Sequence, residues 1–167
     1  GKTSVTHFIA EALNAAQADS AAVIGTLGLG SPGLLQTATH TTPDAISVQK
    51  ALANLQAQNF ASVAMEVSSH ALDQGRVQGV EFDVAVLTNL TRDHLDYHKT
   101  IEAYAEAKSR LFAFPTLKYA VINLDDEYAA LMLAAAQANP AKPQILTYSM
   151  NQAADYQVQD IQYSLSG

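Results

Sequence analysis

The sequence contains no cysteine and no apolar run long enough to cross a membrane. The first absence excludes disulfide bonds and thiolate metal sites, and with no signal peptide either, a cytoplasmic protein is expected. Basic residues are also scarce. Nine Lys and Arg stand against 16 Asp and Glu, giving a formal net charge of −7. Without a basic run, we expect neither a nucleic acid nor a membrane as partner.

Apolar residues make up 49% of the 167 residues, which suits one globular domain with a core of its own. The chain begins with GKTS rather than methionine. It stops just after an alternating stretch, YQVQDIQYSL, which predicts a strand in need of a partner. We therefore expect a piece of a longer protein, truncated at both ends.

Apolar periodicity divides the chain into alternating helices and strands. Thr42 is the expected N-cap of the second helix, with Pro43 at its first position, after a glycine-rich loop over residues 28–44. Continuously apolar strands that alternate with helices predict an α/β fold, with a mostly parallel sheet and helices on both faces. The expected helices cover residues 2–16, 43–58, 101–112 and 125–139, with Thr100 as the N-cap of the third, and the expected strands cover residues 21–28, 60–68, 82–90, 118–124 and 144–150. A polar loop with glycines at 75 and 79 is expected between the second and third strands.

Polar side chains cluster directly after two of these strands. In parallel sheets, ligands bind at the carboxyl ends of the strands, so these clusters predict the functional edge of the sheet. One cluster contains Glu66, Ser68, Ser69 and His70, and the other contains Thr88, Asn89, Thr91, Arg92, Asp93 and His94.

The first four residues have the composition of a phosphate-binding loop. In such a loop glycine admits the phosphates, lysine reaches the terminal ones, a hydroxyl holds magnesium, and the helix N-terminus supplies free N–H groups. An ordinary helix N-terminus is the alternative that this tetrapeptide leaves open. The candidate residues are Gly1, Lys2, Thr3 and Ser4.

Two further residues are candidate metal ligands. Glu66 ends a predicted strand, where a carboxylate can hold the magnesium of a nucleotide. His94 lies in TRDHLDYH beside aspartates, which suits either a transition metal or a polar turn. Asp125, Asp126 and Glu127 are expected to be first-turn acids of the last helix, with a structural role.

Lys108 falls in the middle of an apolar helix face that includes Tyr104, Ala105 and Phe112. A lysine in that position must extend its charge into solvent, lose the charge, or find a partner. Ser68 and Ser69 precede His70, but adjacent residues do not form a catalytic triad and the pattern GxSxG is absent. A serine hydrolase is therefore not expected.

The combination of motifs resembles the Mur ligases of peptidoglycan synthesis, and specifically their P-loop NTPase-like central ATP-binding domain. The resemblance covers essentially the whole chain and is greatest with the MurE type, which adds the third amino acid of the stem peptide. The departure is His40, where the family favours asparagine. The motifs are GKTS, TTPD, MEVSSHAL with the following Q.R, TNLTRDHLDYH, AYAEAK and VINLDDE.

The resemblance implies a role for individual residues of this chain. Lys2 and a carbamylated Lys108 are the implied catalytic residues, because carbamylation by carbon dioxide turns the amine into a carboxylate able to bind magnesium. The implied ATP contacts are Gly1, Lys2, Thr3 and Ser4; the implied metal ligands are Thr3, Glu66, His94 and Lys108; the implied substrate contacts are Thr41, Thr42, Ser68, Gln74 and Arg76.

The resemblance also implies a reaction and its partners. ATP with Mg²⁺ activates the glutamyl carboxylate of UDP-MurNAc-L-Ala-D-Glu as an acyl phosphate, and an amino acid, for which we expect meso-diaminopimelate, displaces phosphate to form an amide. The uridine-binding and amino-acid-binding domains are expected outside this chain, so the isolated chain is expected to be inactive. A monomer is expected.

Two alternatives remain open on the residues alone. One is a relative that uses the same central domain for a different acceptor, such as another Mur ligase or a folylpolyglutamate synthetase-like ligase. The other is a non-catalytic P-loop module that binds nucleotide, in which Lys108 is an ordinary lysine.

Overall fold

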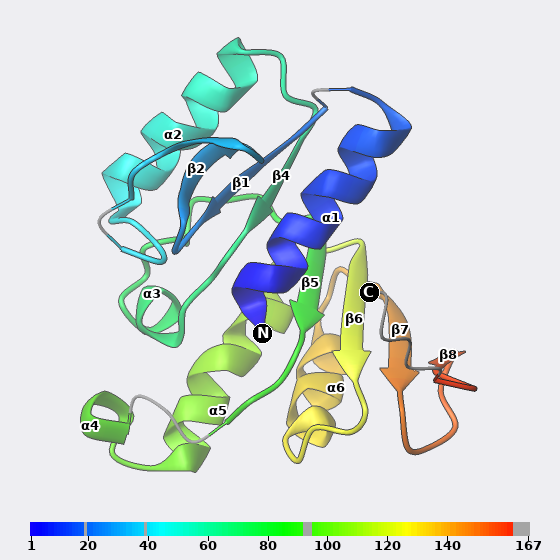
Figure 1. Ribbon diagram of the computed structural model, residues 1–167. Helices are drawn as coiled ribbons and strands as arrows, with labels where there is room; N and C mark the ends of the chain where they lie inside the picture. Colours follow the sequence, from blue (N-terminus) through cyan, green and yellow to red (C-terminus); the bar gives the residue numbers. More distant parts are fainter. Residues whose placement is uncertain (19, 39, 92–94, 162–167) are drawn as a thin grey trace. The chain divides into compact units, whose positions relative to one another are not determined.

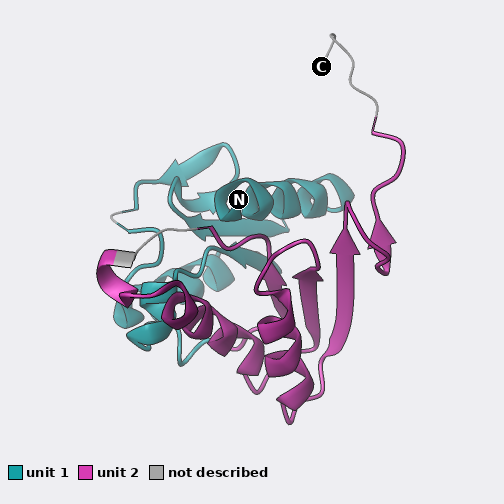
Figure 2. Cartoon of the chain, turned by 90° about the horizontal axis from the view of Figure 1, so that it is seen from below, with its two compact units in different colours: residues 1–80 teal, residues 81–167 magenta. Residues whose placement is uncertain are grey.

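The computed structural model describes residues 1–18, 20–38, 40–91 and 95–161 (Figure 1). The chain forms two compact units, residues 1–80 and residues 81–167, which Figure 2 distinguishes by colour. Each unit has a four-stranded sheet and a hydrophobic core of its own. The expected α/β class is confirmed, with the strands in two sheets.

The first unit contains α1 (Lys2–Ala16), β1 (Ala21–Gly25), β2 (Gly28–Ser31), β3 (Leu34–Gln36), α2 (Ala45–Ala57), β4 (Ser62–Met65) and α3 (Ser69–Asp73). Its sheet has the order β3-β2-β1-β4. The central pair, β1 and β4, is parallel, and the β1–β2 and β2–β3 pairs are antiparallel.

Strand β1 is buried along its whole length because both of its faces are covered. Successive side chains of a strand point to opposite faces. Ala21 and Val23 accordingly pack in the cluster that contains Ala10 of α1, and Ala22 and Ile24 pack in the cluster of α2. Helices therefore lie on both faces of this sheet, as predicted from the continuous apolar run.

The predicted glycine-rich loop is wrong over part of its length, because residues 28–36 form the hairpin of β2 and β3. Gly28 has a φ of 139°, and a Cβ there would overlap the carbonyl oxygen of Gln36 on the neighbouring strand. Glycine in this stretch permits close approach of two strands as well as a turn. The short helix α3 was likewise unpredicted, in a segment expected to be a polar loop.

The second unit contains β5 (Val84–Leu87), α4 (Leu95–His98), α5 (Ile101–Ser109), a 3-10 helix η1 (Arg110–Ala113), β6 (Tyr119–Asn123), α6 (Ala129–Ala138), β7 (Gln144–Ser149) and β8 (Tyr156–Gln157). Its sheet has the order β5-β6-β7-β8, with every pair parallel. The predicted strands of this half are confirmed. In the described tail, strand structure is limited to β8.

One core fills the space between this sheet and its helices. Alternate residues of β5 and β6 face it, and Phe112 of η1 and Met132 of α6 cover them. Thr100 caps α5 as predicted, since its hydroxyl accepts a hydrogen bond from the N–H of Ala103 at 3.1 Å. The helix changes to η1 at Arg110, earlier than the predicted end.

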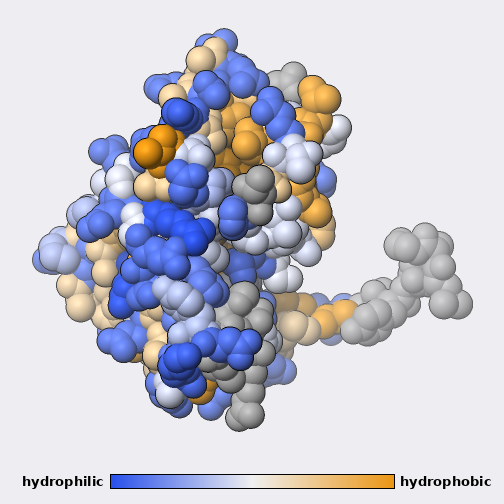
Figure 3. Space-filling view, turned by 90° about the vertical axis from the view of Figure 1, so that its left-hand side faces the viewer, coloured by the Kyte–Doolittle hydropathy of each residue, from blue (hydrophilic) through white to orange (hydrophobic). Residues whose placement is uncertain are grey.

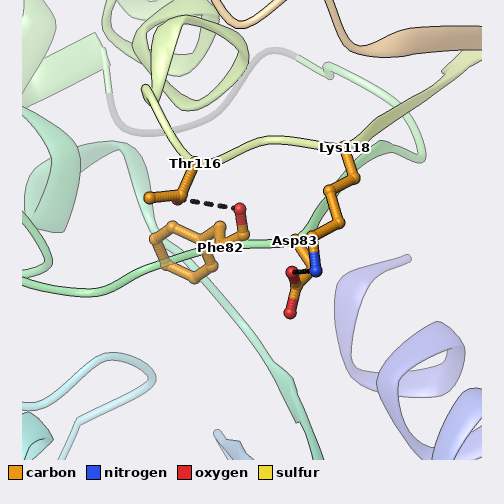
Figure 4. Close-up of polar contacts among 4 residues, drawn as sticks. All are labelled: Phe82, Asp83, Thr116 and Lys118. Atoms are coloured by element: carbon orange, nitrogen blue, oxygen red, sulfur yellow. Dashed lines mark hydrogen bonds and ion pairs between the residues drawn. The ribbon is translucent and has the colours of Figure 1, made fainter.

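The amino ends of β5 and β6 are joined by side chains (Figure 4). The hydroxyl of Thr116 donates to the carbonyl oxygen of Phe82 at 3.0 Å. The ammonium group of Lys118 lies 2.7 Å from the carboxylate of Asp83, and both side chains are exposed. Solvent weakens such an ion pair, so the Thr116 bond and the backbone pairing matter more for this junction.

Hydrophilic residues occupy most of the face shown in Figure 3, and apolar residues gather near its upper edge. Across the described residues, no helix has the length and apolar character needed to cross a membrane.

The end of α6 provides a test of buried hydrogen bonding. The side chain of Asn139 is buried; it donates to the carbonyl oxygens of Phe112 and Phe114, at 3.0 and 2.8 Å, and accepts from the N–H of Ala141. We expect Asn139→Ala to lower the free energy of unfolding by about 2–3 kcal/mol, because it leaves these groups without partners. Urea unfolding followed by circular dichroism measures this change.

The matched control is Lys118→Ala, which removes the exposed ion pair with Asp83 and should hardly move the unfolding midpoint. Equal midpoints for the two variants would contradict the importance assigned to Asn139.

Candidate functional site

The centre of the site is Glu66, which follows β4 at the carboxyl end of the first sheet. Its backbone N–H donates to the carbonyl oxygen of Ile24 at 2.8 Å, which continues the pairing of β1 with β4. Only 2% of the residue is exposed. A buried carboxylate needs hydrogen-bond donors or a cation, so its surroundings reveal what it is built to hold.

Three hydrogen bonds reach the Glu66 carboxylate. The Thr3 hydroxyl donates to Oε2 at 2.8 Å, which joins the start of α1 to the end of β4. The backbone N–H of Thr26 donates to Oε1 at 2.8 Å, and the Thr26 hydroxyl donates to Oε2 at 3.3 Å. Two predicted metal ligands, Thr3 and Glu66, are therefore in direct contact.

Gly25 makes this arrangement possible at the end of β1. A Cβ at this position would overlap Oε1, the carboxyl carbon and Cγ of Glu66. A larger residue would therefore occupy the space that the carboxylate fills. Neither Gly25 nor Thr26 was predicted from the sequence; the signal for both was the segment GTLG directly after an apolar run.

Thr42 is buried against the other side of Glu66. Its hydroxyl donates to the Glu66 carbonyl oxygen at 2.8 Å and accepts from the N–H of Ser68 at 2.9 Å. The prediction that Thr42 caps α2 is wrong. Asp44 is the N-cap, with its carboxylate accepting from the N–H groups of Ile46 and Ser47. A hydrogen bond with the Ser47 side chain, together with these backbone bonds, lowers the pKa of Asp44. The Thr42 hydroxyl instead joins the loop before α2 to the loop after β4.

The other predicted substrate residues meet beside Thr42. Arg76 donates through Nη1 to the Thr42 carbonyl oxygen at 3.0 Å and through Nε to Gln74 Oε1 at 2.8 Å. The Ser68 hydroxyl caps α3 by accepting from the N–H of Ala71. The Thr41 hydroxyl lies 3.0 Å from that of Thr26. The first unit thus brings all five predicted substrate residues around one carboxylate loop.

The phosphate-binding candidates occupy the start of α1. Gly1 is the N-cap residue and forms no side-chain cap; Lys2 is half-buried and Ser4 is exposed. The N-terminus of a helix carries free N–H groups and a partial positive charge. Thr3, in the first turn of α1, bonds the Glu66 carboxylate. This end of α1 therefore offers N–H groups to an anion and hydroxyl and carboxylate oxygens to a divalent cation.

Within the described residues, no group of three or more His, Cys, Asp and Glu side chains is arranged to hold a metal. The donors present are one carboxylate and threonine hydroxyls, which are hard oxygen ligands suited to magnesium and poorly suited to zinc. His94 lies outside the described residues, so its predicted role as a ligand stays a prediction.

Lys108 belongs to the second unit and is half-buried on α5. Its Nζ lies 4.9 Å from the centre of the Tyr104 ring, and Tyr104 is buried one helical turn earlier. An aromatic face stabilises a nearby ammonium group. A lysine on this face was expected to extend its charge into solvent, lose the charge or find a partner, and the Tyr104 ring is such a partner. Carbamylation of Lys108 stays a prediction.

The acidic residues after β6 are structural, but their predicted position is wrong. Helix α6 begins at Ala129, so Asp125 and Asp126 lie in the preceding turn. Asp125 accepts from the Ser149 hydroxyl and the Met150 N–H, both at 2.6 Å, and these bonds lower its pKa. Asp126 accepts from the N–H of Leu90. The two aspartates join the loops at the carboxyl ends of β5, β6 and β7.

Comparison with known proteins supports the resemblance found in the sequence. The chain is 62% identical over 128 residues to the UDP-N-acetylmuramoyl-L-alanyl-D-glutamate--2,6-diaminopimelate ligase of Alkalilimnicola ehrlichii, covering 77% of this chain and 26% of that protein. It is 52% identical over 156 residues to the protein of the same name from Pseudomonas syringae pv. tomato, and the match covers 93% of this chain and 31% of that protein. The protein of that name from Neisseria meningitidis serogroup B is 46% identical over 167 residues, and the match covers 100% of this chain and 34% of that protein.

A solved structure with the same name covers 100% of this chain and 34% of its own, at 48% identity and a TM-score of 0.90. The chain thus spans about a third of the length of these relatives. The family model described as the Mur ligase middle domain matches residues 1–167. A match over the whole chain shows that the protein belongs to the Mur ligase middle domain family.

Proposed function

We propose that this chain is the ATP-binding part of a ligase that joins an amino acid to UDP-MurNAc-L-Ala-D-Glu. Three of the relatives it matches are named for that activity with 2,6-diaminopimelate, so meso-diaminopimelate is the proposed amino acid. The observation that carries the proposal is the contact of Thr3 with Glu66 at the start of α1, beside the group of Thr42 and Arg76. An anion-binding helix end and a substrate-binding cluster therefore share one carboxylate loop.

The reaction that this site suits begins with two anions. The glutamyl carboxylate attacks the γ-phosphate of ATP to give an acyl phosphate and ADP. The amine of the incoming amino acid then displaces phosphate to form the amide. Bringing a carboxylate to a triphosphate needs positive charge and in-line positioning more than a nucleophilic side chain. We propose that Lys2 and the N–H groups at the start of α1 hold the phosphates.

Thr3 and Glu66 are the described residues that would hold a magnesium ion. When bound, the ion neutralises phosphate charge. His94 and Lys108 complete the proposed set of metal ligands, with Lys108 as a carbamate. Carbamylation replaces a cation by an anion, so it would exchange the attraction of Lys108 to the Tyr104 ring for attraction to a metal.

The substrate cluster suits a ligand with carboxylate and amide groups. Two of the nitrogens of Arg76 already bond Gln74, and Nη1 bonds the Thr42 carbonyl, which fixes the plane of the guanidinium. A guanidinium held in this way can still pair with a carboxylate or phosphate through its remaining N–H groups. We propose contacts from Thr41, Thr42, Ser68, Gln74 and Arg76 to the UDP-MurNAc-dipeptide.

The relatives are about three times as long as this chain, so we propose that further domains bind the uridine and the incoming amino acid. We also propose that the whole protein is a cytoplasmic monomer. The chain described here, without the further domains, is proposed to have no ligase activity.

The proposed function predicts a product. The full-length protein that carries this chain should convert UDP-MurNAc-L-Ala-D-Glu, ATP and meso-diaminopimelate into the tripeptide product, identified by mass spectrometry, with ADP release in equal amount. Lys2→Ala should lower kcat by about a hundredfold or more, because it removes a charge at the transferred phosphoryl group. ADP release that ignores UDP-MurNAc-L-Ala-D-Glu would contradict the proposal and favour a nucleotide-binding module, and turnover with a folate acceptor would favour the related ligase.

Lys108 predicts a chemical rescue. Lys108→Ala should lose most ligase activity in the full-length protein, and short carboxylic acids such as acetate or formate should restore part of it by replacing the carbamate. Lys142→Ala, which removes an exposed lysine, is the control and should respond to neither change. Full activity of Lys108→Ala without any additive would exclude the carbamate.

The position of the Glu66 carboxylate is tested through Gly25. In Gly25→Ala the new methyl group takes the place of Oε1, so the carboxylate must leave its donors. We expect the magnesium concentration for half-maximal ligase rate to rise about tenfold or more, a loss of roughly 1.4 kcal/mol in metal binding.

Gly79→Ala is the matched control, since its methyl group would meet only the flexible end of Gln49 at 3.3 Å. An unchanged magnesium requirement in a folded Gly25→Ala protein would show that the carboxylate position does not matter.

A further inference from the structure

Thr26 connects the substrate side of the site to the metal side. Its backbone N–H holds Oε1 of Glu66, and its hydroxyl lies 3.3 Å from Oε2 and 3.0 Å from the hydroxyl of Thr41. We propose that Thr26 is a positioning residue, which orients the Glu66 carboxylate and couples ligand binding at Thr41 to metal binding at Glu66. This inference rests on the proposed function.

Counting donors gives the coupling a direction. A hydroxyl group has one proton to donate and two lone pairs to accept with, and an ionised carboxylate only accepts. The charged carboxylate is the stronger acceptor, so the Thr26 proton belongs to Glu66. Thr41 then donates its proton to Thr26. The three groups form a chain of hydrogen bonds that runs from Thr41 through Thr26 to Glu66.

This direction defines what Thr41 can bind. With its proton directed toward Thr26, the Thr41 hydroxyl offers only lone pairs to a ligand. It therefore suits an N–H or O–H donor, such as a peptide amide or a sugar hydroxyl of the UDP-MurNAc-dipeptide. A ligand that donates to Thr41 strengthens each following bond of the chain, because aligned hydrogen bonds polarise one another.

The same chain helps to hold the Glu66 carboxylate in its observed orientation, from which it would bind a metal. Thr26 itself is exposed, and it adds a hydroxyl bond to a carboxylate already held by Thr3 and by its own N–H. Loss of the hydroxyl should therefore cost little stability. Its effect should appear in the linkage between two ligands, which a purely structural role would leave unchanged.

The test measures Mn²⁺ binding to the full-length protein in the presence of ADP, by electron paramagnetic resonance, with and without saturating UDP-MurNAc-L-Ala-D-Glu. In the wild type we expect the substrate to tighten Mn²⁺ binding about fivefold or more. Thr26→Val keeps the shape and the backbone N–H but loses the hydroxyl, and the ratio should fall below about twofold. Thr26→Ser keeps the hydroxyl and should retain the wild-type ratio.

Two further variants make the result decisive. Thr41→Val breaks the same chain at its other end and should show the same loss of coupling, even if Thr26→Val folds poorly. Thr116→Val removes a hydroxyl bond of 3.0 Å to the Phe82 carbonyl in the second unit and should keep the wild-type ratio. Thermal unfolding of every variant separates loss of coupling from loss of folding.

The role of Thr26 and the proposed function can fail separately. A wild-type ratio in Thr26→Val, a lost ratio in Thr26→Ser, or no coupling in a wild-type protein that ligates its substrate would overturn the role of Thr26 alone. Failure of the wild-type protein to bind UDP-MurNAc-L-Ala-D-Glu would overturn the proposed function and the inference together.

Discussion

The burial of one carboxylate organises the first unit of this protein. Glu66 is 2% exposed, and a charge removed from water to that extent is tolerated only with donors or a cation around it. The donors to the carboxylate come from the first turn of α1 and from the turn after β1, and Thr42, before α2, donates to the backbone carbonyl of the same residue. Each of these segments must therefore reach the same end of the sheet.

Several features that look unrelated in the sequence follow from that constraint. Gly25 ends β1 because any side chain would take the space of the carboxylate. Thr42 does not cap α2, because its hydroxyl is needed between the Glu66 carbonyl and the Ser68 N–H. Asp44 takes over the cap, which starts the helix two residues later than predicted. The site has thus set the boundary of a neighbouring helix.

In the second unit, two aspartates hold together the loops at the carboxyl ends of the strands. Its strand-end loops are joined by Asp125 and Asp126, which bond groups that follow β5 and β7 as well as the start of α6. These acids accept mainly from backbone N–H groups, whereas two of the three hydrogen bonds to the Glu66 carboxylate come from threonine hydroxyls. Lys108 lies over the ring of the buried Tyr104, and this contact stabilises the side chain in its unmodified ammonium form.

Much of this protein is determined locally and was accessible from the order of residues. Continuous apolar runs indicated β1, β4, β5, β6 and β7, since a strand buried on both faces has no polar alternation, and Thr100 was identified as a cap from its place before a helical pattern. The unusual motifs identified the family, and they indicated Thr3, Glu66, Thr42 and Arg76 as site residues.

The periodicity of a sequence does not show which distant segments come into contact. Only the tertiary structure showed that Gly28 lets β2 and β3 approach closely. It also showed that Thr42 bonds a loop 24 residues away and that Thr26 lies between Thr41 and Glu66. A hydroxyl or a glycine has the same local preference wherever the chain folds, and its role depends on which buried charge the fold places beside it.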